Sequence, residues 1–171
     1  MAVLTELMDA PTYALGIHPT AVIDPTAKLG ENVAIGPFCV IGPDTDIGAG
    51  TVLMAHVSVA RGSVIGQNGV LHPGVRVGAH VKISGHVILQ PNVVIGADGF
   101  SFVTATPSIA EIGRRTLGKT PFKVNDDATQ HRIHSLGSVM IGAHVEVGAN
   151  ATIDAGTIRP TRIGHGTKID N

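Results

Sequence analysis

The sequence is poor in aromatic residues, charged residues and cysteine. Its 171 residues include no Trp, one Tyr and one Cys, and aromatic residues make up only 3 %. A single cysteine, Cys39, excludes an internal disulfide framework and a zinc site built from cysteines. Charged residues make up 15 %, and the net charge of −1 shows none of the basic excess that is typical of dedicated nucleic-acid-binding proteins.

Long hydrophobic segments are also missing. No apolar run approaches about 18 residues, so we expect no transmembrane segment. Residues 1–11 contain neither a basic region nor a long apolar stretch, so they do not resemble a signal peptide. The expected location is therefore the cytoplasm.

What the sequence does contain is a six-residue repeat. The chain has 22 Gly residues, and its hydrophobic residues are almost all Val, Ile, Leu and Ala. A large aliphatic residue recurs at every sixth position. The residue four positions after each of these aliphatic residues is small or β-branched, and the residue one position after each of them is often Gly. Stepping by six meets only Ile, Leu or Val: Ile17, Ile23, Leu29, Ile35, Ile41, Ile47, Leu53, Val59, Ile65, Leu71, Val77, Ile83, Leu89 and Ile95.

The period of six predicts an all-β parallel β-helix. It fits neither the helical period of 3.6 nor simple strand alternation, and a β-sandwich would not keep such a phase. One large and one small inward position per hexad suit a short strand followed by a corner, and three hexads close one triangular coil. We expect the Gly after each aliphatic residue to supply a positive-φ turn. Cys39 falls at a small inward position, which predicts a buried thiol.

Breaks in the repeat divide the chain into four parts. Residues 1–16 are a lead-in, 17–100 form the hexapeptide-repeat β-helix, 101–136 are an extended inserted loop, and 137–171 resume the helix. The distance from Ile95 to Ile141 is 46 residues, which is not a multiple of six and so indicates the insertion. A shorter break lies at 155–162. Because no cap follows the last hexad at Ile169, we expect the chain to be truncated.

Three segments carry a family resemblance. They are GIHPTAVIDPTAKLG at 16–30, VIGADGFSF at 94–102, and the stretch 136–171 with its TIDAG and GTKIDN motifs. Together they resemble the hexapeptide-repeat acyltransferases, and among these the UDP-3-O-acylglucosamine N-acyltransferases of lipid A biosynthesis. The opening hexads alone also fit the sister family, the UDP-N-acetylglucosamine O-acyltransferases. The resemblance implies a left-handed prism, whereas the general crossover rule would favour right-handed connections.

The resemblance also implies a reaction and its partners. In this family a hydroxyacyl chain passes from the phosphopantetheine of acyl carrier protein to the 2-amino group of UDP-3-O-acyl-glucosamine. The enzymes are cytoplasmic homotrimers, and neither a further cofactor nor a metal is expected. Family members carry an N-terminal uridine-binding domain and further C-terminal coils. Where the family usually has Arg in an IDRG segment, this chain has Ala155.

The candidate site residues follow from these motifs. The family's catalytic His lies seven residues after the Asp of the IDN segment; that Asp matches Asp170, so the His is expected beyond Asn171 and this chain alone is expected to be inactive. Asp170 is then either the residue that orients this His or an ordinary turn residue. Asp98, Gly99 and Phe100 stand where the chain leaves the prism, and they either shape a substrate cleft or form a simple turn.

The histidines and the basic residues of the loop leave alternatives open. His131 and His134, on the returning side of the loop, are candidate substrate contacts, with His134 preferred. No two histidines are 18 residues apart, so we expect no stacked His column, and most are expected to be solvated. The zinc-dependent carbonic anhydrases share the fold, but the spacing of His80 and His86 does not match their ligands.

The loop is basic, which fits an acidic partner. Arg114, Arg115, Lys119 and Lys123 either steer acyl carrier protein electrostatically or are simply solvated. A non-catalytic solenoid is a further alternative, although a large insertion is unusual in a pure scaffold.

Overall fold

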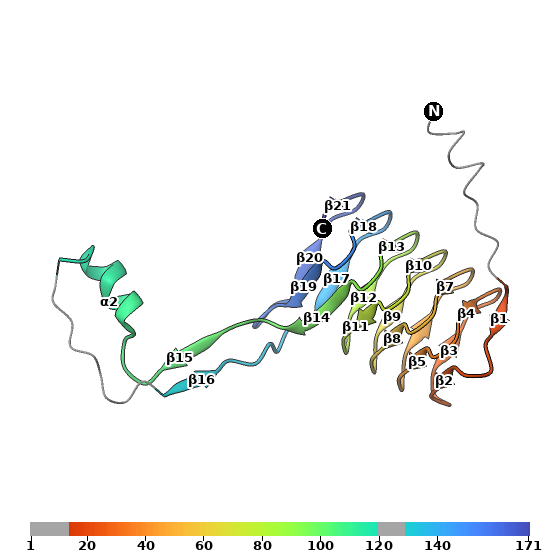
Figure 1. The fold of residues 1–171 in the computed structure, drawn as a ribbon, viewed down its shortest axis with the longest axis horizontal. Coiled ribbons are helices and arrows are strands. Elements are labelled where there is room, and N and C mark those ends of the chain that lie inside the picture. Colours follow the sequence, from red (N-terminus) through yellow and green to blue (C-terminus); the bar gives the residue numbers. More distant parts are fainter. Residues whose placement is uncertain (1–13, 120–128) are drawn as a thin grey trace.

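The computed structural model describes residues 14–119 and 129–171, which form a triangular prism with one projecting arm (Figure 1). Face A contains β1 (Gly16–Ile17), β4 (Ala34–Ile35), β7 (Val52–Leu53), β10 (Val70–Leu71), β13 (Ile88–Leu89), β18 (Glu146–Val147) and β21 (Lys168–Ile169). Face B contains β2 (Val22–Ile23), β5 (Val40–Ile41), β8 (Ser58–Val59), β11 (Arg76–Val77), β14 (Val94–Asp98) and β19 (Thr152–Ala155). Face C contains β3 (Lys28–Leu29), β6 (Asp46–Ile47), β9 (Val64–Ile65), β12 (Lys82–Ile83), β17 (Val139–Ile141) and β20 (Thr161–Ile163).

Each strand pairs in parallel with the strand one coil further along the chain. Ile17 lies opposite Ile35, and Leu53 lies opposite Leu71, so that one coil takes 18 residues. As far as β13, three two-residue strands and three corners therefore make up one coil. This confirms the parallel β-helix that the period of six predicts.

The interior is the expected column of aliphatic side chains. From Val33 to Ile95, the residues at both inward positions are buried, whereas those of the first coil are only partly covered. Cys39 is fully enclosed, with its Sγ 2.9 Å from the carbonyl oxygen of Met54. Burial raises the pKa of the Cys39 thiol. Hydroxyl side chains at the small position bond to the backbone, as Ser63 does to the carbonyl oxygen of Gly78 at 2.7 Å. Within residues 14–119 and 129–171, no buried side-chain nitrogen or oxygen therefore lacks a hydrogen-bond partner.

The glycines after the aliphatic residues have a different role from the one predicted. Apart from Gly96, they do not have positive φ, so the prediction that they form left-handed turns is wrong. Instead, a Cβ on Gly48 would lie 2.4 Å from the backbone nitrogen of Gln67, and one on Gly30 would lie 2.5 Å from that of Ala49. These positions need Gly because the next coil passes too close for any side chain.

The positive-φ residues lie two positions later, at the corners. Asn, His and Gly dominate there, together with one Asp and one Phe, and Asn tolerates this conformation better than most residues. The corner residues with positive φ are Asn32, Phe38, Asp44, Gly50, His56, Gly62, Asn68, Gly74, His80, His86, Asn92, His144, Asn150 and Gly166.

The insertion after β14 forms an arm with its own secondary structure. β15 (Phe102–Thr104) and β16 (Gln130–Arg132) pair in antiparallel fashion, and α2 (Ile109–Thr116) lies beyond them (Figure 1). Ser108 caps α2 and forms a capping box with Glu111. The described part of the insertion, residues 101–119 and 129–136, thus contains two strands and a helix where the sequence suggested a loop. α2 is the only helix in the described ranges, and it is too short and too polar to cross a membrane.

Both breaks in the repeat occur at the same edge of the prism. The arm leaves between β14 on face B and β17 on face C, and one coil later residues 156–160 bridge β19 and β20 at the same corner. The two insertions touch, because the backbone nitrogen of Leu136 donates to the carbonyl oxygen of Thr157 at 2.8 Å. The edge between faces B and C therefore carries both irregular segments, and a site can form next to them.

Candidate site at the base of the arm

Asp98 is the centre of a polar cluster where the arm meets the prism. Oδ2 of Asp98 lies 3.2 Å from Nδ1 of His134 and 3.8 Å from Nε of Arg132, and Oδ1 accepts a hydrogen bond from the backbone nitrogen of Ser135 at 3.1 Å. The hydrogen bonds from His134 and Ser135, with the charge of Arg132, hold the pKa of the Asp98 carboxyl below its usual range. Asp98 is thus held as a carboxylate.

The backbone of Gly99 is held by two of the same residues, Ser135 and Arg132. Its backbone nitrogen donates to Oγ of Ser135 at 3.1 Å, and its carbonyl oxygen accepts from Arg132 at 3.3 Å. The structure therefore brings together Asp98, Gly99 and His134, which the sequence had singled out separately. Sequence reasoning missed Arg132 and Ser135, although both flank His134 in the segment RIHS.

Phe100 projects from this cluster into solvent. Its side chain is 90 % exposed, although its ring meets that of Phe102 edge-on at 5.0 Å. The guanidinium of Arg132 in turn lies over the Phe102 ring, 5.4 Å from its centroid. Of the four predicted substrate-contacting residues, Phe100 and His134 are the two whose side chains face solvent most openly, because His134 is 73 % exposed.

Asp170 lies elsewhere in the molecule. It directly follows β21 on face A, is exposed, and accepts a hydrogen bond from the backbone nitrogen of Asn171 through Oδ1 at 2.8 Å. The structure does not bring it into contact with the Asp98 cluster. Among the described residues, no His side chain bonds to the Asp170 carboxylate.

The histidines along one edge do stack, contrary to the prediction. The rings of His86 and His144 are parallel with their centroids 4.8 Å apart, and His165 meets His144 edge-on at 5.2 Å. Counting by 18 missed the pair, because the arm lies between the two coils. No group of three potential metal ligands was found within residues 14–119 and 129–171.

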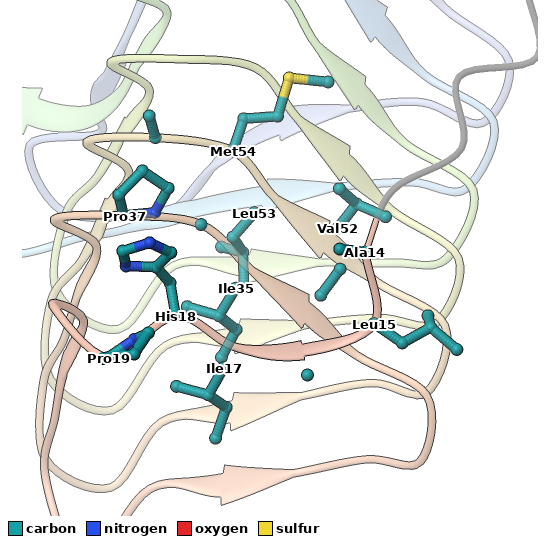
Figure 2. Close-up of a pocket in the computed structure, with 14 residues that line it drawn as sticks. Ala14, Leu15, Ile17, His18, Pro19, Ile35, Pro37, Val52, Leu53 and Met54 are labelled. Atoms are coloured by element: carbon teal, nitrogen blue, oxygen red, sulfur yellow. The ribbon is translucent and has the colours of Figure 1, made fainter.

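A cavity of about 410 Å³ lies on face A at the start of the prism. Figure 2 shows Ala14 and Val52 on one side of it and His18 and Pro19 on the other. Its lining is mainly aliphatic, and His18 is the only polar side chain among its lining residues. This cavity therefore lacks the paired polar groups that the base of the arm has.

Comparisons with curated proteins identify relatives along the whole chain. A UDP-3-O-acylglucosamine N-acyltransferase from Ruegeria pomeroyi is 50 % identical over 172 residues, which cover 100 % of this chain and 47 % of the relative. The protein of the same name from Polynucleobacter asymbioticus is 35 % identical, covering 95 % of this chain and 41 % of the relative. The chain therefore spans about half the length of the curated relatives that it matches. No protein-family model matches the chain.

Solved structures agree on the fold. UDP-N-acetylglucosamine O-acyltransferase from Moraxella catarrhalis superposes with a TM-score of 0.60 at 20 % identity, covering 91 % of this chain and 51 % of the other. The UDP-N-acetylglucosamine acyltransferase of Arabidopsis gives a TM-score of 0.56 at 20 % identity, covering 90 % and 48 %. The prism is accordingly a left-handed parallel β-helix. Over the region that it shares with its curated relatives, the chain belongs to the UDP-3-O-acylglucosamine N-acyltransferase family.

Proposed function

We propose that the protein transfers a hydroxyacyl chain from acyl carrier protein to the 2-amino group of UDP-3-O-acyl-glucosamine, a step of lipid A biosynthesis. The observation that carries this proposal is the 50 % identity to a relative of that name along the whole of this chain. The solved O-acyltransferases are only 20 % identical and support the fold alone. The N-acyltransferase is therefore the better-supported of the two activities.

The reaction joins an amine to a thioester. The amine nitrogen attacks the thioester carbonyl, a C–N bond forms, the C–S bond breaks, and the phosphopantetheine thiol leaves with a proton. A base must take the proton from the amine, and a neutral His is suited to this near pH 7. Backbone N–H groups can stabilise the oxyanion, so that the residues themselves supply the chemistry without a metal.

Asp170 is the proposed partner of that base. A carboxylate that bonds to one imidazole nitrogen fixes the tautomer and stabilises the imidazolium. This assignment requires a His seven residues after Asp170, and the genomic reading frame past Asn171 tests it directly. A different residue at that position would overturn the assignment.

Activity of the full-length gene product that includes this chain, with the Asp170→Asn substitution, gives the biochemical test. Asn keeps the shape and the hydrogen bond to the backbone of Asn171 but removes the charge. We expect kcat to fall by about 10²-fold or more, in line with the contribution of general-base catalysis, in an assay that follows acylation of UDP-3-O-acyl-glucosamine. Asp46→Asn, an exposed carboxylate on β6 of face C, is the matched control and should leave kcat unchanged. Equal activity of both variants would contradict the role of Asp170, and acylation of UDP-N-acetylglucosamine instead would favour the O-acyltransferase.

The base of the arm is the proposed contact region for substrate. Phe100 and His134 present exposed side chains there, while the polar groups of Asp98 and Gly99 are engaged by the returning strand. Asp98 and Gly99 accordingly act by holding this surface rather than by touching substrate.

Acyl carrier protein is the proposed macromolecular partner. The last turn of α2 carries Arg114 and Arg115, and Arg114 lines a cavity of about 390 Å³ between α2 and β15. Acyl carrier proteins are acidic, so this end of the arm supports electrostatic steering. Lys119 closes the same segment, and Lys123 lies outside the described residues.

We also propose that the protein is a cytoplasmic homotrimer. Supporting this, the outward positions of face A carry no charge on three consecutive coils, where they are the partly exposed Val52, Val70 and Ile88. Faces depleted of charge are typical of the core of subunit interfaces, and cyclic symmetry closes such contacts. The mass in solution, measured by light scattering, tests the trimer.

A further inference from the structure

The connection between prism and arm contains a gap in strand pairing. The last prism pair joins Asp98 to Ala155, and the first ladder pair of the arm joins Phe102 to Arg132. Residues 99–101 between them have no ladder partner on the prism. A two-stranded ribbon is only marginally stable by itself in water, so contacts in this gap decide how firmly the arm is held.

The gap is bridged by a compact set of polar contacts. Both carboxylate oxygens of Asp98 and both backbone polar groups of Gly99 are engaged by residues 132–135 of the returning strand. Beyond them, the backbone nitrogen of Ile133 donates to the carbonyl oxygen of Ser101 at 2.9 Å. Asp98 thus belongs to the prism through β14, yet it binds the strand that returns from the arm.

The same contacts fix the backbone on both sides of Phe100. Gly99 is held by Ser135 and Arg132, and Ser101 is held by Ile133. Because the Phe100 side chain is 90 % exposed, burial of its ring contributes little to stability. The backbone on both sides of Phe100 is nevertheless held by hydrogen bonds, as expected where a side chain must be presented at a fixed position.

We propose that Asp98 is a positioning residue: through His134, Arg132 and Ser135 it clamps the arm to the prism and so presents Phe100 and the arm's basic end to the substrates. The clamp itself rests on the contacts above, and its catalytic consequence rests on the proposed function. Asp98 contacts no reacting atom in this scheme.

Hydrogen exchange of the whole protein tests the clamp without any assay of activity. In Asp98→Ala we expect the amides of 101–104 and 130–133 to exchange at least about tenfold faster, because local opening no longer breaks the Asp98 contacts. The amides of β11 and β12 in the prism should keep their rates. Asp98→Asn keeps the shape of the side chain without its charge and should give a smaller increase, and Asp46→Asn should give none. Unchanged exchange of the arm in Asp98→Ala would overturn the clamp.

Steady-state kinetics of the same variants test the positioning role. Misplacing a substrate-contacting group by about 1 Å can cost about 10²-fold in rate, so we expect kcat/KM for the acyl donor to fall between 10- and 100-fold in Asp98→Ala. Asp98→Asn should recover part of the loss. A loosened arm with unchanged kcat/KM would overturn the positioning role. Absence of acyl transfer by the full-length wild-type gene product would instead count against the proposed function, and the exchange result would stand separately.

Discussion

The prism and the arm of this protein are stabilised in different ways. In the prism, each coil buries aliphatic side chains against the coils before and after it, and residues such as Leu71 and Ile95 are fully enclosed. In the arm, α2 has no buried side chain, and Leu117 at its end is 80 % exposed. The arm is instead stabilised by the capping box of α2, the β15–β16 ladder and the cluster around Asp98. The prism is therefore stabilised by the aliphatic burial that each coil repeats, whereas the arm depends on a few specific polar contacts.

The largest expected difference between the two regions comes from one substitution made in each. Leu71→Ala removes a fully buried side chain from the column and should lower the free energy of unfolding by about 2–5 kcal/mol. Leu117→Ala removes an exposed side chain of the arm and should change it by less than about 0.5 kcal/mol. Urea unfolding curves measure both. Equal losses would show that the arm contributes to the core.

Glycine-to-alanine substitutions give a smaller contrast. In Gly48→Ala the new Cβ would lie 2.4 Å from the backbone nitrogen of Gln67, which must force adjacent coils apart. Such overpacking typically costs about 1–3 kcal/mol. Gly113→Ala in α2 meets nothing within 4 Å and should stabilise the helix by up to about 1 kcal/mol. Thermal unfolding followed by circular dichroism checks both, and a neutral Gly48→Ala would contradict the close-approach explanation.

Acid should produce the smallest and most local effect. The hydrogen bond from His134 lowers the pKa of Asp98, and that from the backbone of Ser108 lowers the pKa of Glu111. A carboxyl whose pKa is lowered by folding stabilises the folded state above its unfolded value, about 4, and this contribution is lost as the pH falls through the folded value. Amide resonances of Ser108 and Ser135 should therefore shift below about pH 4.

The prism supplies the reference for that titration. Its aliphatic core residues do not titrate, so core amides such as that of Leu71 should stay unchanged over the same range. Asp24 at the first coil is an exception, because the hydrogen bond from Thr26 also lowers its pKa. Simultaneous changes in the arm and in the core would show that the two regions are coupled more tightly than their contacts indicate.

Prediction from the sequence was most successful where one interaction repeats. The period of six identifies the inward positions correctly, because every coil places the same residue of the hexad at the same point of the triangle. It also placed Cys39 in the core, which the structure confirms. The role of the repeat glycines was predicted wrongly, because the approach of Gly48 to Gln67 is a contact between coils that local propensity does not reveal.

The candidate site was only partly predictable. The motif around Asp98 and the position of His134 were both noticed, yet their pairing spans 36 residues and depends on how the arm folds back. The stacked pair His86 and His144 was missed for a related reason, because the arm separates them in sequence while adjacent coils place them together. Regular spacing predicts contacts only within uninterrupted repeats.

The amino-acid sequence by itself determined the prism. The large and small inward residues of successive hexads are buried together only when the chain forms a narrow, regularly stacked coil. The sequence also determined where the repeat breaks. Only the tertiary structure decided how the arm is attached, because the contacts of Asp98 with Arg132, His134 and Ser135 join segments that no periodic pattern relates. The repeat is encoded by local burial, whereas the site is created by the return of the chain.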